Sequence, residues 1–282
     1  MLDKETIERR IMYCLYAYGT NTGLRRVASA TSEATYDELL HIRKRFITPE
    51  AIRNAATMIA SATLSVRDPA IWGAEGTSCA SDSKKFGAWD QNLLTEWHAR
   101  YRGRGVMIYW HVAKRATCIY SQLKKCSSSE VSSMIEGVLH HCTDMKVERH
   151  FVDSHGQSEV AFAFCRLLGF ELAPRLKAIA SQKLYLPHWD AKQSLSNLSP
   201  ILRGPIDWEI IERQFDDMVK YAAALRHRTA DPEAIMSRFT RTAIVHPTYQ
   251  ALAELGRAIK TIYLCRYLRS EELRREVNEG LN

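Results

Sequence analysis

Hydrophobic residues at helical spacing dominate the first seventy positions of the chain. An apolar stripe runs over residues 3–19, with Asp3 placed to cap the helix and Gly19 to end it. A second start signal is Thr48 followed by Pro49, which suit the cap and the first position of another helix. We therefore predict a helical segment over residues 1–72.

Patterns typical of strands begin after this segment. They occur at residues 76–86, 105–112, 117–123 and 146–152. A helix that begins at Ser129 separates the third strand from the fourth, and an almost continuously apolar helix over residues 157–168 follows. An apolar helix of this kind suits an element packed on a sheet, so we predict an α/β domain over residues 73–189.

The last third of the chain carries helical periodicity. The stretches are residues 206–226, 231–241, 247–268 and 270–280. Prolines separate them, and a proline interrupts a helix because it lacks the N–H donor. Because strand signals disappear from about residue 190, we predict an all-helical region over residues 190–282.

Composition indicates a folded protein with a preference for polyanions. Hydrophobic residues make up 46% and charged residues 25% of the 282 positions, values that exclude a disordered chain. Thirty-nine Lys and Arg against 32 Asp and Glu give a net charge of +7, which favours partners such as nucleic acid. Charge alone does not separate a DNA-binding protein from other basic proteins.

Cysteine usage and hydropathy favour a cytoplasmic protein. The seven cysteines are odd in number and widely spaced, as expected for reduced thiols. The first residues lack the apolar stretch of a signal peptide, and no apolar run approaches the roughly 20 residues that cross a bilayer. We expect a soluble protein in the cytoplasm, with no membrane partner.

Two aspartates follow runs that can form buried strands. Asp82 is expected at the end of the first strand, and Asp153 follows the apolar run Phe151-Val152 ahead of Gly156. Two carboxylates at the ends of neighbouring strands make a hard-oxygen site suited to magnesium, which can serve phosphoryl transfer. An Asp after a strand is also common in turns and helix caps, so the spacing alone leaves both interpretations open.

Basic and aromatic residues lie near these aspartates in the sequence. The basic residues are Lys84, Lys85, Arg100, Arg102 and Arg104. They can contact DNA phosphates without reading sequence, although a solvated loop is the alternative. Trp89 and Trp97 can stack on bases but are more often core residues, and His111 is more often a core histidine than one lining a site.

Several short motifs occur in a fixed order along nearly the whole chain. They are residues 72–86, Met107-Ile108-Tyr109-Trp110-His111, Phe151-Val152-Asp153-Ser154-His155-Gly156, Leu167-Leu168-Gly169-Phe170, Pro174-Arg175, Lys183-Leu184-Tyr185, Ala253-Glu254-Leu255-Gly256-Arg257, Glu272-Leu273-Arg274-Arg275-Glu276 and Gly280-Leu281-Asn282. Together they resemble the transposases of the Tn3 family of replicative transposons. The resemblance implies a ribonuclease H-like mixed sheet with flanking helices, preceded by a helical segment and followed by an all-helical insertion region.

The same resemblance implies the roles of individual residues. Asp82 becomes the first acid and Asp153 the second acid of a DDE triad, and both hold the metal. The third acid, a Glu, is expected just beyond Asn282, which is the last residue of the sequence. Several glutamates lie near that end but do not occupy the family's position. They are Glu254, Glu271, Glu272, Glu276 and Glu279.

The implied function is metal-dependent DNA strand cleavage and strand transfer in replicative transposition. Two Mg²⁺ ions are expected in the complete enzyme, with Mn²⁺ able to substitute, and the partners are transposon-end and target DNA. A homodimer is expected of the full-length protein, and the truncated chain is expected to be inactive alone. The alternatives are a catalytically inactive DNA-binding or assembly remnant and a ribonuclease H-like nuclease.

Overall fold

The computed structural model describes residues 3–72, 77–113, 117–141, 143–153, 156–240 and 246–281. The chain divides into two compact units, Met1–Ile59 and Ala60–Asn282. In the described residues, no helix is both long and apolar enough to cross a bilayer.

The unit Met1–Ile59 is helical. Its helices are α1 (Lys4–Gly19), α2 (Leu24–Ala30), α3 (Tyr36–Phe46) and the first part of α4 (Pro49–Ser65). The side chain of Asp3 accepts a hydrogen bond from the Thr6 amide, and Thr48 accepts one from Ala51, so both predicted helix starts are confirmed. Buried side chains that include Cys14, Leu39 and Ile42 hold the helices together.

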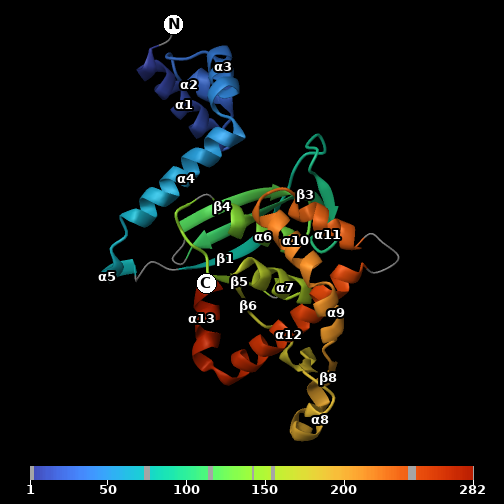
Figure 1. The fold of residues 1–282 in the computed structure, drawn as a ribbon. Coiled ribbons are helices and arrows are strands. Elements are labelled where there is room, and N and C mark those ends of the chain that lie inside the picture. The colour runs from blue at the N-terminus through green and yellow to red at the C-terminus, as the bar shows by residue number, and fades with distance from the viewer. Residues whose placement is uncertain are drawn as a thin grey trace. The chain divides into compact units, whose positions relative to one another are not determined.

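The unit Ala60–Asn282 is built on a six-stranded mixed sheet (Figure 1). The strands are β1 (Ser78–Phe86), β2 (Glu96–His98), β3 (Gly103–Ala113), β4 (Thr117–Lys124), β5 (Arg149–Val152) and β6 (Glu171–Pro174). The order is β2-β3-β1-β5-β6, and β4 pairs with β3. β1 runs antiparallel to β3 and parallel to β5, which is parallel to β6. The predicted order of strand, strand, strand, helix, strand corresponds to β1, β3, β4, α6 and β5, and the short strand β2 was not predicted.

Helices account for most of the rest of this unit. They are α5 (Pro69–Trp72), α6 (Glu130–His140), α7 (Glu159–Leu168), α8 (Ala191–Ser194), α9 (Trp208–Arg213), α10 (Phe215–Arg226), α11 (Pro232–Thr240), α12 (Pro247–Arg269) and α13 (Glu271–Leu281). Short 3₁₀ turns lie at Ile179–Ser181 and Ser196–Ile201. The stretch predicted as one helix over residues 206–226 is two helices, because the chain leaves helical geometry at Gln214.

One strand lies in the region where only helices were predicted. β8 (Leu202–Pro205) pairs in parallel with β7 (Leu184–Leu186), so the prediction of no strand after residue 190 is wrong for these four residues. β8 contains Gly204 and Pro205, two residues that are depleted in strands. β8 forms because the backbone of β7 supplies its hydrogen-bond partners. A local sequence pattern does not reveal such pairing between separate segments.

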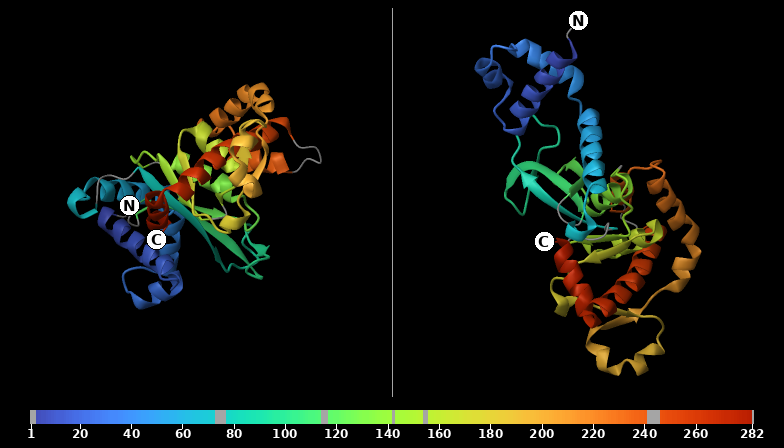
Figure 2. Two further views of the ribbon diagram at one scale, coloured as in Figure 1. Left: turned by 90° about the horizontal axis from the view of Figure 1, so that it is seen from below. Right: turned by 90° about the vertical axis from the view of Figure 1, so that its left-hand side faces the viewer.

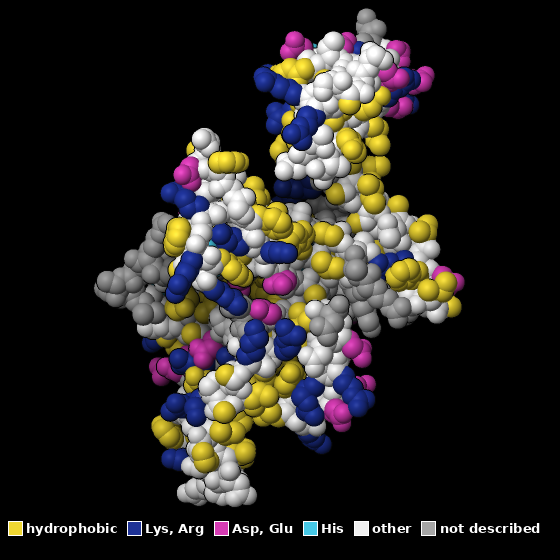
Figure 3. Space-filling model, turned by 180° about the vertical axis from the view of Figure 1, so that it is seen from behind, with side chains coloured by type: hydrophobic (Ala, Val, Ile, Leu, Met, Phe, Trp, Pro, Cys, Tyr) yellow, Lys and Arg dark blue, Asp and Glu magenta, His cyan; other side chains and the backbone are white. Residues whose placement is uncertain are grey.

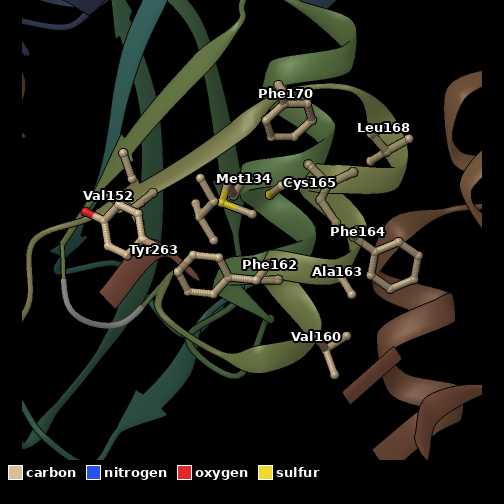
Figure 4. Packing of buried hydrophobic residues seen from close by; sticks show 14 of the residues in the cluster. Met134, Val152, Val160, Phe162, Ala163, Phe164, Cys165, Leu168, Phe170 and Tyr263 are labelled. Carbon is tan, nitrogen blue, oxygen red and sulfur yellow. The ribbon is translucent and has the colours of Figure 1, made fainter. Parts of the chain in front are cut away.

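The core lies between the sheet and α7. Phe162 and Cys165 of α7, Met134 of α6 and Tyr263 of α12 are buried together and point toward one another (Figure 4). The nearly continuous apolar sequence of α7 is explained by this position, since α12 covers it on one side and the sheet on another.

Helices α6 and α13 cover opposite faces of the sheet (Figure 2). Gly137 of α6 lies so close to His111 that an added Cβ would be 1.9 Å from the ring carbon Cε1. Gly280 of α13 lies against Phe151, where an added Cβ would be 2.4 Å from the ring. His111 pairs with Ser81 of β1, whereas Phe151 pairs with Ala80, the residue just before Ser81. Side chains of successive strand residues point to opposite faces, so His111 and Phe151 lie on opposite faces of the sheet.

Candidate active site

Asp82 and Asp153 occupy neighbouring positions on two adjacent parallel strands. The pairing of β1 with β5 reaches Ser81 and Val152, and the next residues along the two strands are Asp82 and Asp153. Adjacent strands lie about 4.8 Å apart, so the two backbones bring both carboxylates to one place on the sheet.

The expected position of Asp82 at the end of its strand needs a correction. β1 continues four residues beyond it to Phe86, because β3 keeps pairing with β1 as far as Val106. Only the parallel pairing with β5 stops at Ser81. At Asp82, β1 is therefore still paired with β3 on one side, whereas its pairing with β5 on the other side has already ended.

The two carboxylates lie on the face of the sheet that α13 covers. Side chains alternate along a strand, so Asp82 shares a face with Ala80, which pairs with Phe151 beneath Gly280 of α13. The Asp82 side chain is exposed and its Oδ1 accepts a hydrogen bond of 2.7 Å from the Ser83 amide, whereas Asp153 is half-buried.

A buried chain of polar side chains ties together the three strands beneath this site. The Ser81 hydroxyl lies 2.8 Å from the Tyr109 hydroxyl and 2.7 Å from Nε2 of His150, and Nδ1 of His150 lies 3.0 Å from Sγ of Cys79. Burial lowers the pKa of His150, so the imidazole is neutral and each of its nitrogens has one polar neighbour. These bonds fix β1 against β3 and β5 next to the two aspartates.

The pKa of Tyr109 is affected by burial and by the charges of nearby carboxylates. Burial raises the pKa of its phenol, and the negative charges of Glu130, Asp82 and Asp153 raise it further. Glu130 was not singled out in the sequence, where it reads as an acidic residue in the first turn of α6.

His111 is a core residue, the interpretation that its strand position favoured. It is completely buried, and its Nε2 lies 3.2 Å from the carbonyl oxygen of Met134. Burial lowers its pKa to about 3.

The buried histidines predict a loss of stability in mild acid. His111 and His150 are neutral in the folded protein, whereas in the unfolded chain a histidine takes up a proton near its ordinary pKa of 6.5. The unfolded state therefore binds more protons as pH falls below 6.5, and stability present above that pH is progressively lost toward the lower folded pKa. We expect the free energy of unfolding to fall by about 2 kcal/mol between about pH 7 and 5.5.

Urea unfolding at the two pH values measures this effect. Carboxylates contribute little in this range, because their ordinary pKa values lie near 4. Equal stability at both pH values would contradict the assignment of neutral buried histidines.

Of the predicted DNA-contacting residues, the two lysines lie on β1 and the three arginines lie at or near the start of β3. Lys84 is exposed and shares the face of Asp82 by alternation, whereas Lys85 points to the opposite face. Arg100 and Arg102 are exposed near the turn between β2 and β3. Arg104 is exposed and forms an ion pair of 2.9 Å with Asp90.

Two tryptophans for which the sequence left base stacking and a core position open are exposed. Trp89 is 85% exposed and Trp97 is 61% exposed, because the segment that carries them projects beyond the sheet (Figure 1).

The glutamates near the end of the chain have ion-pair partners. Glu276 pairs with Arg149 on β5, Glu254 with Arg257, and Glu271 with Arg275. Glu276 therefore serves to dock α13 on the sheet.

The residues present fit a divalent metal through two carboxylates. No cluster of three or more His, Cys, Asp or Glu side chains with metal-binding geometry occurs in the parts of the chain that the structure describes. Magnesium commonly binds one or two carboxylates and completes its shell with water and substrate phosphate oxygens. Asp82 and Asp153 supply the two carboxylates, with Asp82 open to solvent.

The mixed sheet with aspartates on adjacent central strands defines a ribonuclease H-like fold of the DDE class. The family described as the Tn3 transposase DDE domain matches residues 2–282, and the chain belongs to it. A DDE domain of this kind implies dependence on divalent metal. Membership in the family does not favour the alternatives of an inactive remnant or an unrelated nuclease.

Curated relatives resemble the chain over most of its length. It is 29% identical over 273 residues to the transposase for transposon Tn1546 of Enterococcus faecium, a match that covers 96% of this chain and 27% of the relative. The transposase for transposon Tn501 of Pseudomonas aeruginosa is 26% identical, with 93% of this chain and 26% of the relative covered. The chain thus spans about a quarter of the length of these relatives.

Proposed function

We propose that the chain is the catalytic part of a DNA transposase that cuts DNA strands and joins the freed 3′ hydroxyl groups to target DNA. The observation that carries the proposal is the strand register that makes Asp82 and Asp153 neighbours, at the point where the pairing of β1 with β5 stops. Membership in the transposase family and the net charge of +7 support DNA as the substrate.

Asp82 and Asp153 act as the metal ligands in this proposal, with Mg²⁺ as the natural ion and Mn²⁺ as a substitute. The divalent ions, when bound, stabilise the attacking and leaving oxygens of an in-line phosphoryl transfer. The chain itself holds the two carboxylates at fixed spacing, through the bonds of Ser81 to Tyr109 and His150. No covalent enzyme intermediate is required, because water is the nucleophile in the first displacement and the freed 3′ hydroxyl in the second.

The third acid, in our proposal, is a Glu in the segment that follows α13. This helix runs along β5 in the same direction, since Glu276 pairs with Arg149 and Gly280 lies against Phe151. Four helical residues advance about 6 Å, close to the advance of two strand residues. One further turn after Gly280 therefore lies level with Asp153, on the face that carries both aspartates.

DNA binding in this proposal uses Lys84, Lys85, Arg100 and Arg102, which contact phosphates. We expect the affinity of the chain for DNA to fall steeply with salt, with a slope of log K against log salt concentration of about −4. Lys84→Ala should reduce that slope by about 1 and weaken binding alike for all sequences. The exposed Lys192 supplies the control, because Lys192→Ala should leave the slope unchanged.

Fluorescence anisotropy with short duplexes between about 50 and 200 mM salt measures the slope. Binding that barely changes over this range, or that strongly prefers one sequence, would contradict phosphate contact by these residues.

The assembly and location of the full-length protein are further parts of the proposal. We infer a homodimer, which would present one catalytic site to each transposon end. A cytoplasmic location is supported by the cysteines, which include the buried free thiols Cys79 and Cys165.

The test of the proposed function is a cleavage and joining assay on transposon-end DNA. The protein to use is the longer one that adds the DNA-recognition region and the segment following α13. We expect nicking and strand joining with Mg²⁺ or Mn²⁺ and neither reaction after chelation. Cleavage that persists without divalent metal would overturn the proposal.

A further inference from the structure

A projecting segment between β1 and β3 presents several aromatic side chains to solvent. We call residues 87–102 the aromatic arm; it includes β2 and projects from the sheet at the upper right of Figure 1. Trp89 is 85% exposed, Trp97 61% and Tyr101 49%. Single exposed aromatics are ordinary on protein surfaces, but three on one short arm mark an interaction site.

The arm is held by specific bonds although its aromatic side chains are exposed. The carbonyl oxygen of Trp89 accepts hydrogen bonds from the Asn92 amide at 3.0 Å and the Thr95 hydroxyl at 2.9 Å. The base of the arm is fixed by Glu96, which accepts hydrogen bonds from the amide and the hydroxyl of Ser127. The Trp89 ring is therefore presented on a fixed backbone.

Charge on and around the arm is positive. Residues 84–104 contain five Lys and Arg and two Asp and Glu. Both acids are ion-paired, Asp90 with Arg104 and Glu96 with Lys125. The guanidinium of Arg100 lies 5.5 Å from the centre of the Tyr101 ring, so an aromatic face and a cation are presented together at the tip. Dark-blue basic side chains and yellow apolar ones mix on the projection at the upper left of Figure 3.

We propose that the aromatic arm binds DNA in which a base has left the double-helical stack, with that base lying on the face of Trp89. Arg100 and Arg102 contact the phosphates on either side of the base. The proposal rests on the proposed function, because it takes the transposase's DNA as the ligand. Aromatic side chains with neighbouring cations are the combination that binds single-stranded nucleic acid, since every base offers a flat face and every nucleotide a negative charge.

The arm also fixes where such a base would lie. Trp89 lies seven positions after Asp82, and an extended chain covers about 3.3 Å per residue, so the Cα atoms of the two residues lie within about 23 Å of each other. DNA advances about 3.4 Å per nucleotide, which places the unstacked base within about seven nucleotides of the scissile phosphate. Strands are cut and joined there, and a base at a cut strand end leaves the stack more readily than one inside an intact duplex.

The first experiment compares the binding of two DNA ligands to the 282-residue chain. One is a fully paired duplex and the other the same duplex with a short single-stranded gap. Trp89→Ala is expected to weaken binding of the gapped DNA by about 5- to 150-fold and to change binding of the paired duplex by less than about threefold. Trp189→Ala removes a tryptophan that is 64% exposed elsewhere, and it should change neither affinity.

The second experiment detects the contact directly. Gapped DNA carrying 5-iodouracil in the gap is irradiated with the chain, and the cross-linked residue is identified by mass spectrometry. We expect the cross-link on Trp89. Because Trp89 is exposed, Trp89→Ala should keep the fold, which circular dichroism verifies.

Three outcomes would overturn the proposal. They are equal weakening of both DNA ligands by Trp89→Ala, no effect on either, and a cross-link confined to residues outside the arm. An unchanged DNA affinity with loss of self-association would assign the arm to a protein partner instead. These readouts use binding alone, so they are independent of the cleavage assay that tests the proposed function.

Discussion

Replacing Asp82 or Asp153 by Asn in the full-length transposase is expected to lower the rate of DNA strand cleavage by at least about a thousandfold. Asn keeps the shape of the side chain but removes the charge that binds a divalent ion. When residues act as one catalytic unit, the losses of rate from replacing them do not add up, so the double variant should be about as inactive as either single variant. DNA binding should remain, because the basic residues are untouched.

Cleavage of end-labelled transposon DNA under single-turnover conditions measures this loss. Asp190→Asn is the matched control: Asp190 is exposed at the start of α8, and its side chain makes no capping hydrogen bond. The control should retain full activity. If either Asp82→Asn or Asp153→Asn kept a rate within tenfold of the unchanged protein, the catalytic assignment would have to be abandoned.

The second large effect concerns stability and the contact between α12 and α7. An added Cβ at Gly256 would lie 1.8 Å from the backbone carbonyl oxygen of Glu159. The atoms that the added Cβ meets are backbone atoms of Glu159, which cannot move away as a flexible side chain can, so the two helices would have to separate. We expect Gly256→Ala to lower the free energy of unfolding by about 3 kcal/mol, although Gly to Ala inside a helix normally raises it by up to about 1 kcal/mol.

Denaturant unfolding followed by circular dichroism measures the change. Gly19 at the end of α1 is the control, because an added Cβ there would meet nothing within 4 Å. Gly19→Ala should be neutral or slightly stabilising. A Gly256→Ala protein as stable as the unchanged chain would mean that α12 does not approach α7 as closely as described.

Long elements with regular spacing were predictable from the sequence. Alternation over residues 105–112 identified β3, and the apolar run over residues 157–168 identified α7, because each pattern reflects one periodicity over many residues. β2, β6 and β8 have three or four residues each, too few to show alternation. They form because a neighbouring strand supplies hydrogen-bond partners.

The site was predictable in part. Asp82 lies within a recognisable strand and Asp153 directly follows another, but they are 71 positions apart, and only the resemblance to a family joined them in one site. The extension of β1 past Asp82 depends on β3, which is a tertiary effect. The exposure of Trp89 depends on the projection of a segment beyond the sheet, and an aromatic side chain in a loop carries no signal of that. Glu130 joins the charges near Tyr109 only once α6 is packed.

The docking of α13 also sets an order of events during synthesis. Arg149 and its partner Glu276 are 127 residues apart, whereas the pairing of β1 with β3 joins residues about 20 to 34 apart in the chain. The β-hairpins can close while the ribosome is still making the helices, but the face of β5 that carries Phe151 is covered only after α13 has been made. Until then the growing protein exposes apolar sheet surface to the cell, which makes this stage the one where chaperones would be needed most.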